Sequence, residues 1–435
     1  MIKPLSLAIA LSVIVANPAP ARANSATPVV GTPAAPAWVE KSNAYARILL
    51  DAQAPFAPED MSFMGVTGYD TRVIDLNPGF PERFRAATAK SRDELKARLA
   101  TERDPNVRQD LAIMIRAADE SIATSELNER LALPWRDVPQ IVFSGLTSLL
   151  SDQTPPERRA FALERLKRYV GQGGDTTPLT ELAKARYTER ATDPKLLRPT
   201  KLEVEQALGN VDTYIGGIRD LFAKYKVEGA DEALAAMETQ LKGYGSWART
   251  TVLPSARTDT KLPPELYANQ LRQTGVDIDP QRLVRLAQVE FMETRAAMAQ
   301  LAPLVAKDRG LKVDNPHDYV AVVRALKRDA IANDQLVARY RTAIDVIDPI
   351  IRKEKIVDVP QRPMVMRLGT EAESAVRSAP HLLPAPLVGN TGQQGQFVLP
   401  VSLATADGTA LQYDDFNFDA ARWTLSGHEG RPGHE

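Results

Sequence analysis

The chain has 435 residues, and its 54 Lys and Arg against 55 Asp and Glu give a formal net charge of −1, without the basic surplus expected of a nucleic-acid-binding protein. Hydrophobic residues make up 44% and charged residues 25%, which is typical of a globular protein and excludes a mainly disordered chain. The sequence contains no cysteine, so disulfides, thiolate ligands and cysteine nucleophiles are excluded and any metal must bind His, Asp or Glu.

The N-terminal residues 1–23 have the features of a secretory signal peptide. Lys3 precedes an apolar stretch from Leu5 to Ala16, and Ala21-Arg22-Ala23 is a small-x-small cleavage pattern. We therefore expect cleavage near Ala23 and a periplasmic or secreted protein, with an uncleaved anchor as the alternative. The apolar stretch is shorter than the roughly 20 residues of a membrane span, and no longer one follows, so no stable span is expected. Residues 24–37, rich in Pro and small residues, are predicted to be a flexible leader.

Helix-start signals dominate the chain from residue 38 onward. Two of these are capping boxes and three are a capping residue followed by proline: Ser91 with Glu94, Thr154 with Glu157, Asp104-Pro105, Asp279-Pro280 and Asn315-Pro316. We predict a mainly α-helical fold, organised as one body over residues 38–435.

One segment shows helical periodicity with particular clarity. Its apolar residues alternate steps of four and three and are Val204, Leu208, Val211, Ile215, Ile218 and Phe222. This spacing predicts a single helix whose apolar face lies in the core. Further helices are expected near 231–241, 280–301 and 335–351.

Strand-forming residues occur late in the chain, at 364–368 and 396–403. Pro400 cannot donate a hydrogen bond to a sheet, so the second strand is predicted at a sheet edge or a bulge. An edge strand beside a catalytic helix could bind an extended peptide by main-chain hydrogen bonds, which makes Phe397, Val398 and Leu399 candidate substrate contacts. The alternative is a short structural hairpin that covers the core.

The last residues of the chain contain the strongest chemical signal. His428 is followed directly by Glu429, and His434 comes shortly after. Hydrolytic zinc sites combine neutral imidazole ligands with a carboxylate that accepts a proton from the attacking water. In H-E-x-x-H the two histidines are four residues apart and share a helix face. Here they are six apart, about 120° around a regular helix, so both can reach one ion only if the backbone kinks or a new helix begins near Arg431.

Several segments together resemble a bacterial family known as domain of unknown function 885. They are Met64-Gly65-Val66-Thr67-Gly68-Tyr69-Asp70, Leu133-Pro134-Trp135-Arg136, Asn390-Thr391-Gly392, Gly395-Gln396-Phe397-Val398-Leu399-Pro400 and the terminal His428-Glu429-Gly430-Arg431-Pro432-Gly433-His434-Glu435. The resemblance extends over nearly all of the expected mature chain. Members of this family are predominantly helical, are often exported, and look like relatives of zinc-dependent peptidases of the gluzincin type.

The resemblance implies roles for three residues of the terminal motif. His428 and His434 would bind one zinc ion, and Glu429 would be the general base. A catalytic zinc usually has three protein ligands and a water. In the family the third ligand is expected to be a glutamate on a helix beyond Glu435, so we expect the domain to be truncated at its C-terminus.

These observations predict an exported zinc-dependent hydrolase that acts on a peptide or small amide. His381, near the second strand, and Arg431, within the motif, are further candidate substrate contacts; the alternatives are a surface-loop histidine and an arginine paired with an acidic neighbour. Two other functions stay open: a non-catalytic helical binding or scaffold protein without a complete metal site, and a hydrolase of non-peptide amides or esters. The sequence indicates no oligomeric state.

Overall fold

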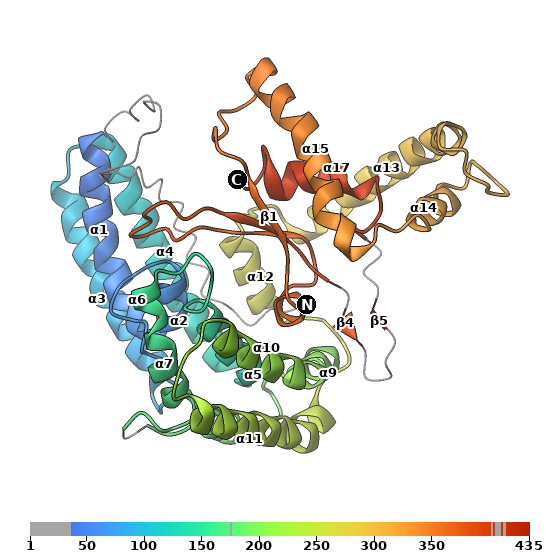
Figure 1. The fold of residues 1–435 in the computed structure, drawn as a ribbon. Helices are drawn as coiled ribbons and strands as arrows, with labels where there is room; N and C mark the ends of the chain where they lie inside the picture. Colours follow the sequence, from blue (N-terminus) through green and yellow to red (C-terminus); the bar gives the residue numbers. More distant parts are fainter. Residues whose placement is uncertain (1–35, 175, 402, 405–409, 412–414) are drawn as a thin grey trace, which may run out of the picture. The chain divides into compact units, whose positions relative to one another are not determined.

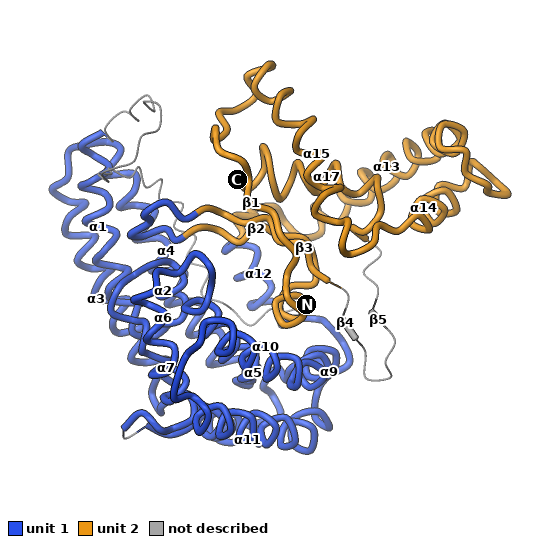
Figure 2. Tube along the Cα trace, in the orientation of Figure 1, with its two compact units in different colours: residues 1–273, 386–393 blue, residues 274–385, 394–435 orange. Residues whose placement is uncertain are grey.

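The structure, a computed structural model, describes residues 36–435 except 175, 402, 405–409 and 412–414. The predicted signal peptide and the leader up to residue 35 lie outside the described residues. Backbone contacts divide the chain into two compact units (Figure 2). Unit 1 extends to Gln273 and includes Pro386–Gln393, and unit 2 comprises Thr274–Ala385 and Gln394–Glu435.

Unit 1 is built from helices, coloured blue to yellow in Figure 1. Its α-helices are α1 (Ala37–Gln53), α2 (Pro58–Phe63), α3 (Phe80–Thr101), α4 (Pro105–Leu131), α5 (Val138–Thr147), α6 (Pro156–Arg159), α7 (Phe161–Tyr169), α8 (Leu179–Thr188), α9 (Lys201–Gly209), α10 (Val211–Lys224), α11 (Asp231–Trp247) and α12 (Pro264–Gln273). Shorter 3₁₀ and π segments are η1 (Ala54–Phe56), η2 (Ala248–Val252) and η3 (Leu253–Ser255). Helices α1, α3 and α4 pack side by side around Leu49, Leu95 and Leu111.

The predicted helix starts are confirmed where the capping side chain accepts hydrogen bonds from the following backbone. Asp104 does so at α4, and Asp279 does so at α13 (Pro280–Asp308). The start at Ser91 is wrong, because this residue lies inside α3 and bonds to the carbonyl of Thr88. The start at Asn315 is also displaced: its side chain closes a turn, and the next helix is capped by Asp318 instead.

The capping box at Thr154 does not form, although α6 begins nearby. The Thr154 hydroxyl bonds to Ser151 and to the carbonyl of Ser148, and no side chain caps the helix. The apolar stripe from Val204 to Phe222 does lie in the core, but on two helices, because α9 ends before Asn210 and α10 follows it. Periodicity alone therefore located the buried face and missed the break.

Unit 2 combines helices with a three-stranded sheet and a two-stranded one. Its helices are α13, α14 (Tyr319–Lys327), α15 (Asn333–Glu354), α16 (Glu371–Val376) and α17 (Ala421–Leu425), followed by a π-helical segment, η4 (Ser426–Gly430). The three-stranded sheet is formed by β1 (Val365–Leu368), β2 (His381–Leu383) and β3 (Gln396–Leu399), and the two-stranded one by β4 (Leu403–Ala404) and β5 (Ala410–Leu411). The sequence-based expectation of a mainly helical protein with a small sheet beside the helix that carries His428 and Glu429 is confirmed.

The position predicted for the second strand within this sheet is wrong. The order is β1-β3-β2, so β3 is the central strand, parallel to β1 and antiparallel to β2. Strand β3 ends at Leu399, which leaves Pro400 outside the ladder and removes the reason to expect an edge. Phe397, Val398 and Leu399 are all buried, and the edge strands are β1 and β2.

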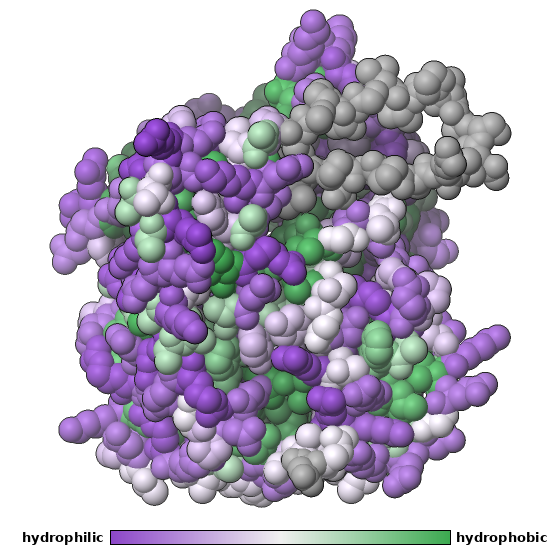
Figure 3. Space-filling view, turned by 90° about the vertical axis from the view of Figure 1, so that its left-hand side faces the viewer, coloured by the Kyte–Doolittle hydropathy of each residue, from purple (hydrophilic) through white to green (hydrophobic). Residues whose placement is uncertain are grey.

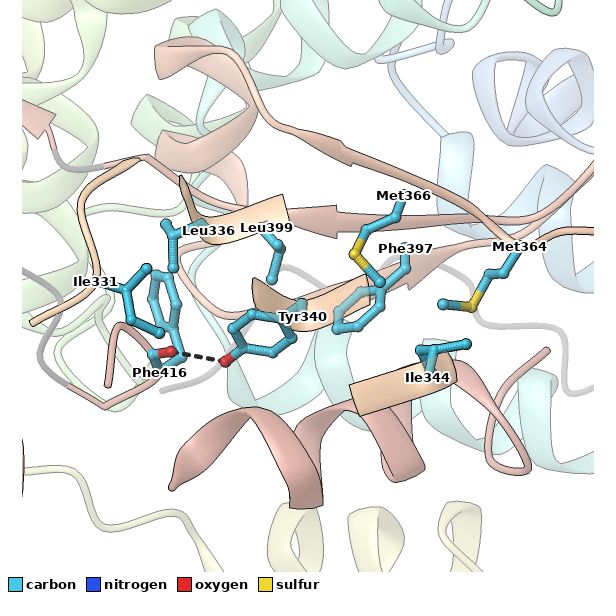
Figure 4. Close-up of a cluster of buried hydrophobic side chains, with 9 residues drawn as sticks. All are labelled: Ile331, Leu336, Tyr340, Ile344, Met364, Met366, Phe397, Leu399 and Phe416. Atoms are coloured by element: carbon cyan, nitrogen blue, oxygen red, sulfur yellow. Dashed lines mark hydrogen bonds between the residues drawn. The ribbon is translucent and has the colours of Figure 1, made fainter. Parts of the chain in front are cut away.

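The core of unit 2 lies between α15 and the sheet (Figure 4). Tyr340 and Ile344 on α15 pack with Met364, Phe397 and other apolar residues. The Tyr340 hydroxyl donates to the carbonyl of Phe416 at 2.7 Å, which satisfies its buried polar atom.

None of the described helices is long and apolar enough to cross a membrane. On the face drawn in Figure 3, hydrophilic residues cover most of the area.

Candidate metal centre

The backbone of the terminal motif departs from a regular helix in two steps. The π-helical turn η4 carries Gly427, His428 and Glu429, and its buried residues Ser426 and Gly430 face the core. A Cβ atom on Gly430 would come within 3.0 Å of Ile344 and 3.1 Å of Met364, so the absence of a side chain allows this close packing. The chain then leaves the helix at Arg431, which is followed by a cis peptide bond to Pro432.

The hydrogen bonds after this point explain how two histidines six residues apart come together. The N–H of Gly433 donates to the carbonyl of Gly427, and the N–H of His434 donates to that of His428, both at 3.0 Å. In an α-helix these donors would bond four residues back, whereas here they bond six residues back. Two residues are thus looped out, and His434 takes the place that the fourth residue after His428 has in a regular helix. A distortion was predicted; the form it takes is this loop, and no new helix begins near Arg431.

Gly433 is required for this loop because of a close backbone approach. A Cβ atom there would lie 1.9 Å from the carbonyl oxygen of His428 and 2.6 Å from that of Gly427. Real Cβ atoms do not come so close to backbone oxygens, so any larger residue would break the two hydrogen bonds that bring His434 into place.

The loop brings the three predicted site residues together. Glu429 Oε1 lies 3.8 Å from His428 Nε2, and its Oε2 lies 3.8 Å from His434 Nε2. The two imidazole rings are nearly perpendicular, with centroids 4.9 Å apart. One donor atom of each residue lies within 4.8 Å of the others, and within the described part of the chain this is the group of three or more His, Asp or Glu that could hold a metal ion.

The exposure of these side chains fits a ligand-binding role. His428 is 65% and His434 54% exposed, whereas Glu429 is only 16% exposed. Neither imidazole has a hydrogen-bond partner among the described residues, so their ring nitrogens are available to a ligand. Imidazole is a ligand that zinc prefers when cysteine is absent, and hydrolytic zinc sites place a carboxylate beside the metal as general base. The residues present therefore fit a zinc ion or a similar divalent cation.

Glu429 is oriented by the edge of the sheet. Its Oε2 accepts a hydrogen bond from the N–H of Leu382 on β2 at 3.2 Å. His381, Leu382 and Leu383 are in register with Val398, Phe397 and Gln396 of β3, and the N–H of Leu382 bonds to Glu429. Sequence reasoning missed this contact, because a backbone donor 47 residues away has no signature in the sequence.

His381 lies at the start of β2, the strand that contacts Glu429, and is not one of the three clustered donors. Its Nδ1 is 2.9 Å from the carbonyl oxygen of Ala379, and burial lowers the pKa of the imidazole. It is half-buried on an edge strand rather than on the surface loop that was the alternative reading.

Arg431 is not placed to bind a substrate carboxylate. Its side chain is only 3% exposed, and it donates to Glu435 Oε2 at 2.6 Å, to Asp348 Oδ2 at 3.1 Å and to the carbonyl of Arg362 at 2.6 Å. The alternative that the sequence left open, pairing with an acidic neighbour, is the one observed. Glu435 lies close to Arg431 in the sequence, whereas Asp348 and Arg362 are far from it and carried no signal.

The fold and the site define a mainly helical protein with an imidazole–carboxylate centre beside the edge of a small sheet. The chain belongs to the bacterial proteins of unknown function called DUF885, since that family matches residues 58–435.

Two solved structures have a similar fold. One is described as "a putative lipoprotein of unknown function from Shewanella oneidensis", with 16% identity and a TM-score of 0.57, and the other as "the putative lipoprotein from Colwellia psychrerythraea", with 14% identity and a TM-score of 0.62. Each comparison covers 92% of this chain and 71% of the other. At such identities the likeness establishes the fold alone. No curated protein matches the chain.

Proposed function

We propose that this chain is an exported, metal-dependent hydrolase whose centre is formed by His428, His434 and Glu429, and that its substrates are peptides. The observation that carries the proposal is the position of Glu429, whose carboxylate lies 3.8 Å from both imidazoles while the edge of the sheet orients it. Many hydrolytic zinc sites combine imidazole ligands with a carboxylate beside the metal, as these three residues would.

The roles of the three side chains follow from their exposure and contacts. His428 and His434 would hold the metal through their ring nitrogens, and a third ligand beyond Glu435 stays a prediction of the family resemblance. When bound, zinc lowers the pKa of a coordinated water to about 7 and polarises a carbonyl group. Glu429 would accept the proton of the attacking water on its carboxylate and pass it to the leaving amine. The Leu382 N–H supports this by fixing the carboxylate plane.

The edge strand β2 supports a peptide as substrate. Because Leu382 is in register with Phe397 of β3 and its N–H bonds to Glu429, the main-chain groups of this residue are expected on the open side of the edge strand β2, away from β3. An extended peptide along β2 could pair with the Leu382 carbonyl and would then pass close to Glu429. Phe397, Val398 and Leu399 would contribute by holding β2 in place from the core, without touching the peptide.

Export is part of the proposal and rests on residues 1–23. Their charge, apolar stretch and cleavage pattern support a signal peptide. The description of both solved neighbours as lipoproteins is consistent with it.

The test separates metal binding from turnover. After removal of metal with a chelator, the protein is titrated with Zn²⁺ and assayed with a mixture of peptides. We expect Glu429→Gln to bind Zn²⁺ nearly as the unsubstituted protein does and to lose turnover, and His428→Ala and His434→Ala to lose both. Glu371→Gln, which alters an exposed carboxylate on α16, is the matched control and should change neither. Equal Zn²⁺ uptake by His428→Ala would refute the metal centre, and full turnover by Glu429→Gln would remove this residue from its role.

A further inference from the structure

The loop between the two histidines is anchored by one buried cation, Arg431. Its Nε, Nη1 and Nη2 donate to three acceptors from separate parts of unit 2. These are Glu435 next to His434, Asp348 on α15, and the carbonyl of Arg362 in the segment before β1. The guanidinium thus ties the looped segment to the core helix of the unit at one side and to the end of the motif at the other.

Glu435 is as buried as Arg431 and has a second cationic partner. Its side chain is 3% exposed, and Arg362 donates to its Oε1 while Arg431 donates to its Oε2. Because Glu435 follows His434 directly, these ion pairs fix the backbone on the far side of the histidine. The imidazole of His434, by contrast, is half-exposed and has no hydrogen-bond partner among the described residues.

We propose that Arg431 is a positioning residue that holds His434 opposite His428 and Glu429, and thereby sets the affinity of the site for its metal. The proposal rests on the metal centre proposed above. A looped segment without such anchors would populate many conformations, and binding would have to select the one in which both imidazoles meet. Groups that orient metal ligands from outside typically alter metal affinity by about 10–100-fold when they are removed.

The geometry of the contacts requires an arginine. Three acceptors in different directions match the planar fork of a guanidinium, whereas the single ammonium of a lysine cannot reach all three. We therefore expect Arg431→Lys to keep the charge and to lose most of the effect.

The neighbouring Arg352 provides a matched control. It also donates to Asp348 Oδ2, at 3.2 Å, and to the carbonyls of Val359 and Pro360, but none of its hydrogen bonds is to residues 426–435. Arg352→Met and Arg431→Met both remove a hydrogen-bond donor from the Asp348 carboxylate. A difference in metal affinity between the two variants is therefore due to the loop contacts of Arg431 and not to the loss of a partner by Asp348.

The experiment is a titration of the metal-free protein with Co²⁺, followed by its visible absorption, which reports both affinity and ligand geometry. We expect Arg431→Met and Arg431→Lys to bind Co²⁺ about tenfold or more weakly with an altered spectrum, and Arg352→Met to match the unsubstituted protein. Unchanged affinity and spectrum in a folded Arg431→Met protein would overturn the proposal. An equal loss in Arg352→Met would also overturn it, because the effect would then be a general one on unit 2.

Hydrogen exchange separates this proposal from the proposed function. The amides of Gly433 and His434, bonded to the carbonyls of Gly427 and His428, should exchange faster in Arg431→Met than in Arg352→Met. If the unsubstituted protein bound no Co²⁺, the proposed metal centre would fail and the claim about affinity with it. Positioning of His434 would still be supported by faster exchange in Arg431→Met alone, and overturned by equal exchange in the two variants.

Discussion

Two largely buried arginine–carboxylate pairs, one in each unit, have similar chemistry and different surroundings. In unit 1, Arg158 binds both oxygens of Asp70 at 2.8 Å, and the Ser62 hydroxyl donates to the same carboxylate. In unit 2, Arg431 binds Glu435 beside two exposed imidazoles that have no hydrogen-bond partner among the described residues. A buried ion pair is therefore no indicator of function by itself. What distinguishes the candidate centre is the two exposed imidazoles beside the pair, whose ring nitrogens have no hydrogen-bond partner among the described residues.

In the unit 1 pair, both carboxylate oxygens of Asp70 are hydrogen-bonded to other protein side chains. Burial raises the pKa of Asp70, but the hydrogen bonds and charge of Arg158, with the bond from Ser62, outweigh burial and lower it overall. Arg158 also donates to the carbonyl of Ser62 at 2.7 Å. These contacts join α6 to the end of α2 and to the segment after it, so we assign the pair to stability.

Removal of the cation in unit 1 should have the largest effect. Arg158→Met leaves the Asp70 carboxylate buried without its partner, and breaking a buried pair in this way typically costs about 3–5 kcal/mol. We expect a fall of that size in the free energy of unfolding, measured by urea denaturation, with unchanged Zn²⁺ uptake by the folded protein. Arg168→Met, which loses only a surface pair with Glu164, should cost less than about 1 kcal/mol. If Arg158→Met lost Zn²⁺ affinity and kept its stability, the assignment of this pair to stability would be wrong.

A substitution in the loop between the two histidines should instead reduce the affinity for metal more than the stability. Gly433→Ala places a Cβ atom 1.9 Å from the His428 carbonyl oxygen and should displace His434. We expect a loss of roughly 50-fold in Zn²⁺ affinity, equal to about 2 kcal/mol, and a smaller loss of unfolding free energy.

Gly427→Ala is the control for this loop, because a Cβ atom there meets no atom within 4 Å apart from its chain neighbours and the backbone of its own helical turn. Calorimetric titration with Zn²⁺ compares the two variants. Equal affinities would show that the close approach at Gly433 does not govern the site.

The smallest effect that we expect concerns unit 1 alone and is a change of stability with pH. Burial raises the pKa of Asp137, which caps α5 in unit 1, from 3.8 to about 6. Since its folded pKa lies above its unfolded pKa, the contribution of this group is complete below pH 4 and is lost as the pH rises through 6. We expect it to make the protein more stable at pH 5 than at pH 7 by about 1–2 kcal/mol.

Asp137→Asn isolates this contribution, because it keeps an oxygen for the cap on Gln140 and removes the charge. Urea denaturation at both pH values should show a smaller gain on acidification in the variant than in the unsubstituted protein. An identical gain in both proteins would mean that Asp137 does not carry the effect.

Much of the helical fold was predictable because the signals are local. Asp104 and Asp279 cap helices by bonding amides two or three residues away, and the apolar stripe from Val204 to Phe222 follows the helical period. Ser91 carried the same type of signal and lies inside α3, since a capping residue does not end a helix whose apolar face continues to pack. The order of the sheet was not predictable, because β2 and β3 pair across a connection that crosses between the units.

The identity of the candidate site was determined by the sequence, and its geometry by the tertiary structure. In the absence of cysteine, His428, Glu429 and His434 were the one close set of residues with the right chemistry. Their spacing of six residues left open whether they meet. The tertiary structure decided this. Gly433 allows two hydrogen bonds that each reach six residues back, Arg431 binds Asp348 and Arg362, and Leu382 on β2 orients Glu429. Residue types are local properties, whereas the partners that hold them lie up to 83 residues away and become neighbours only in the folded chain.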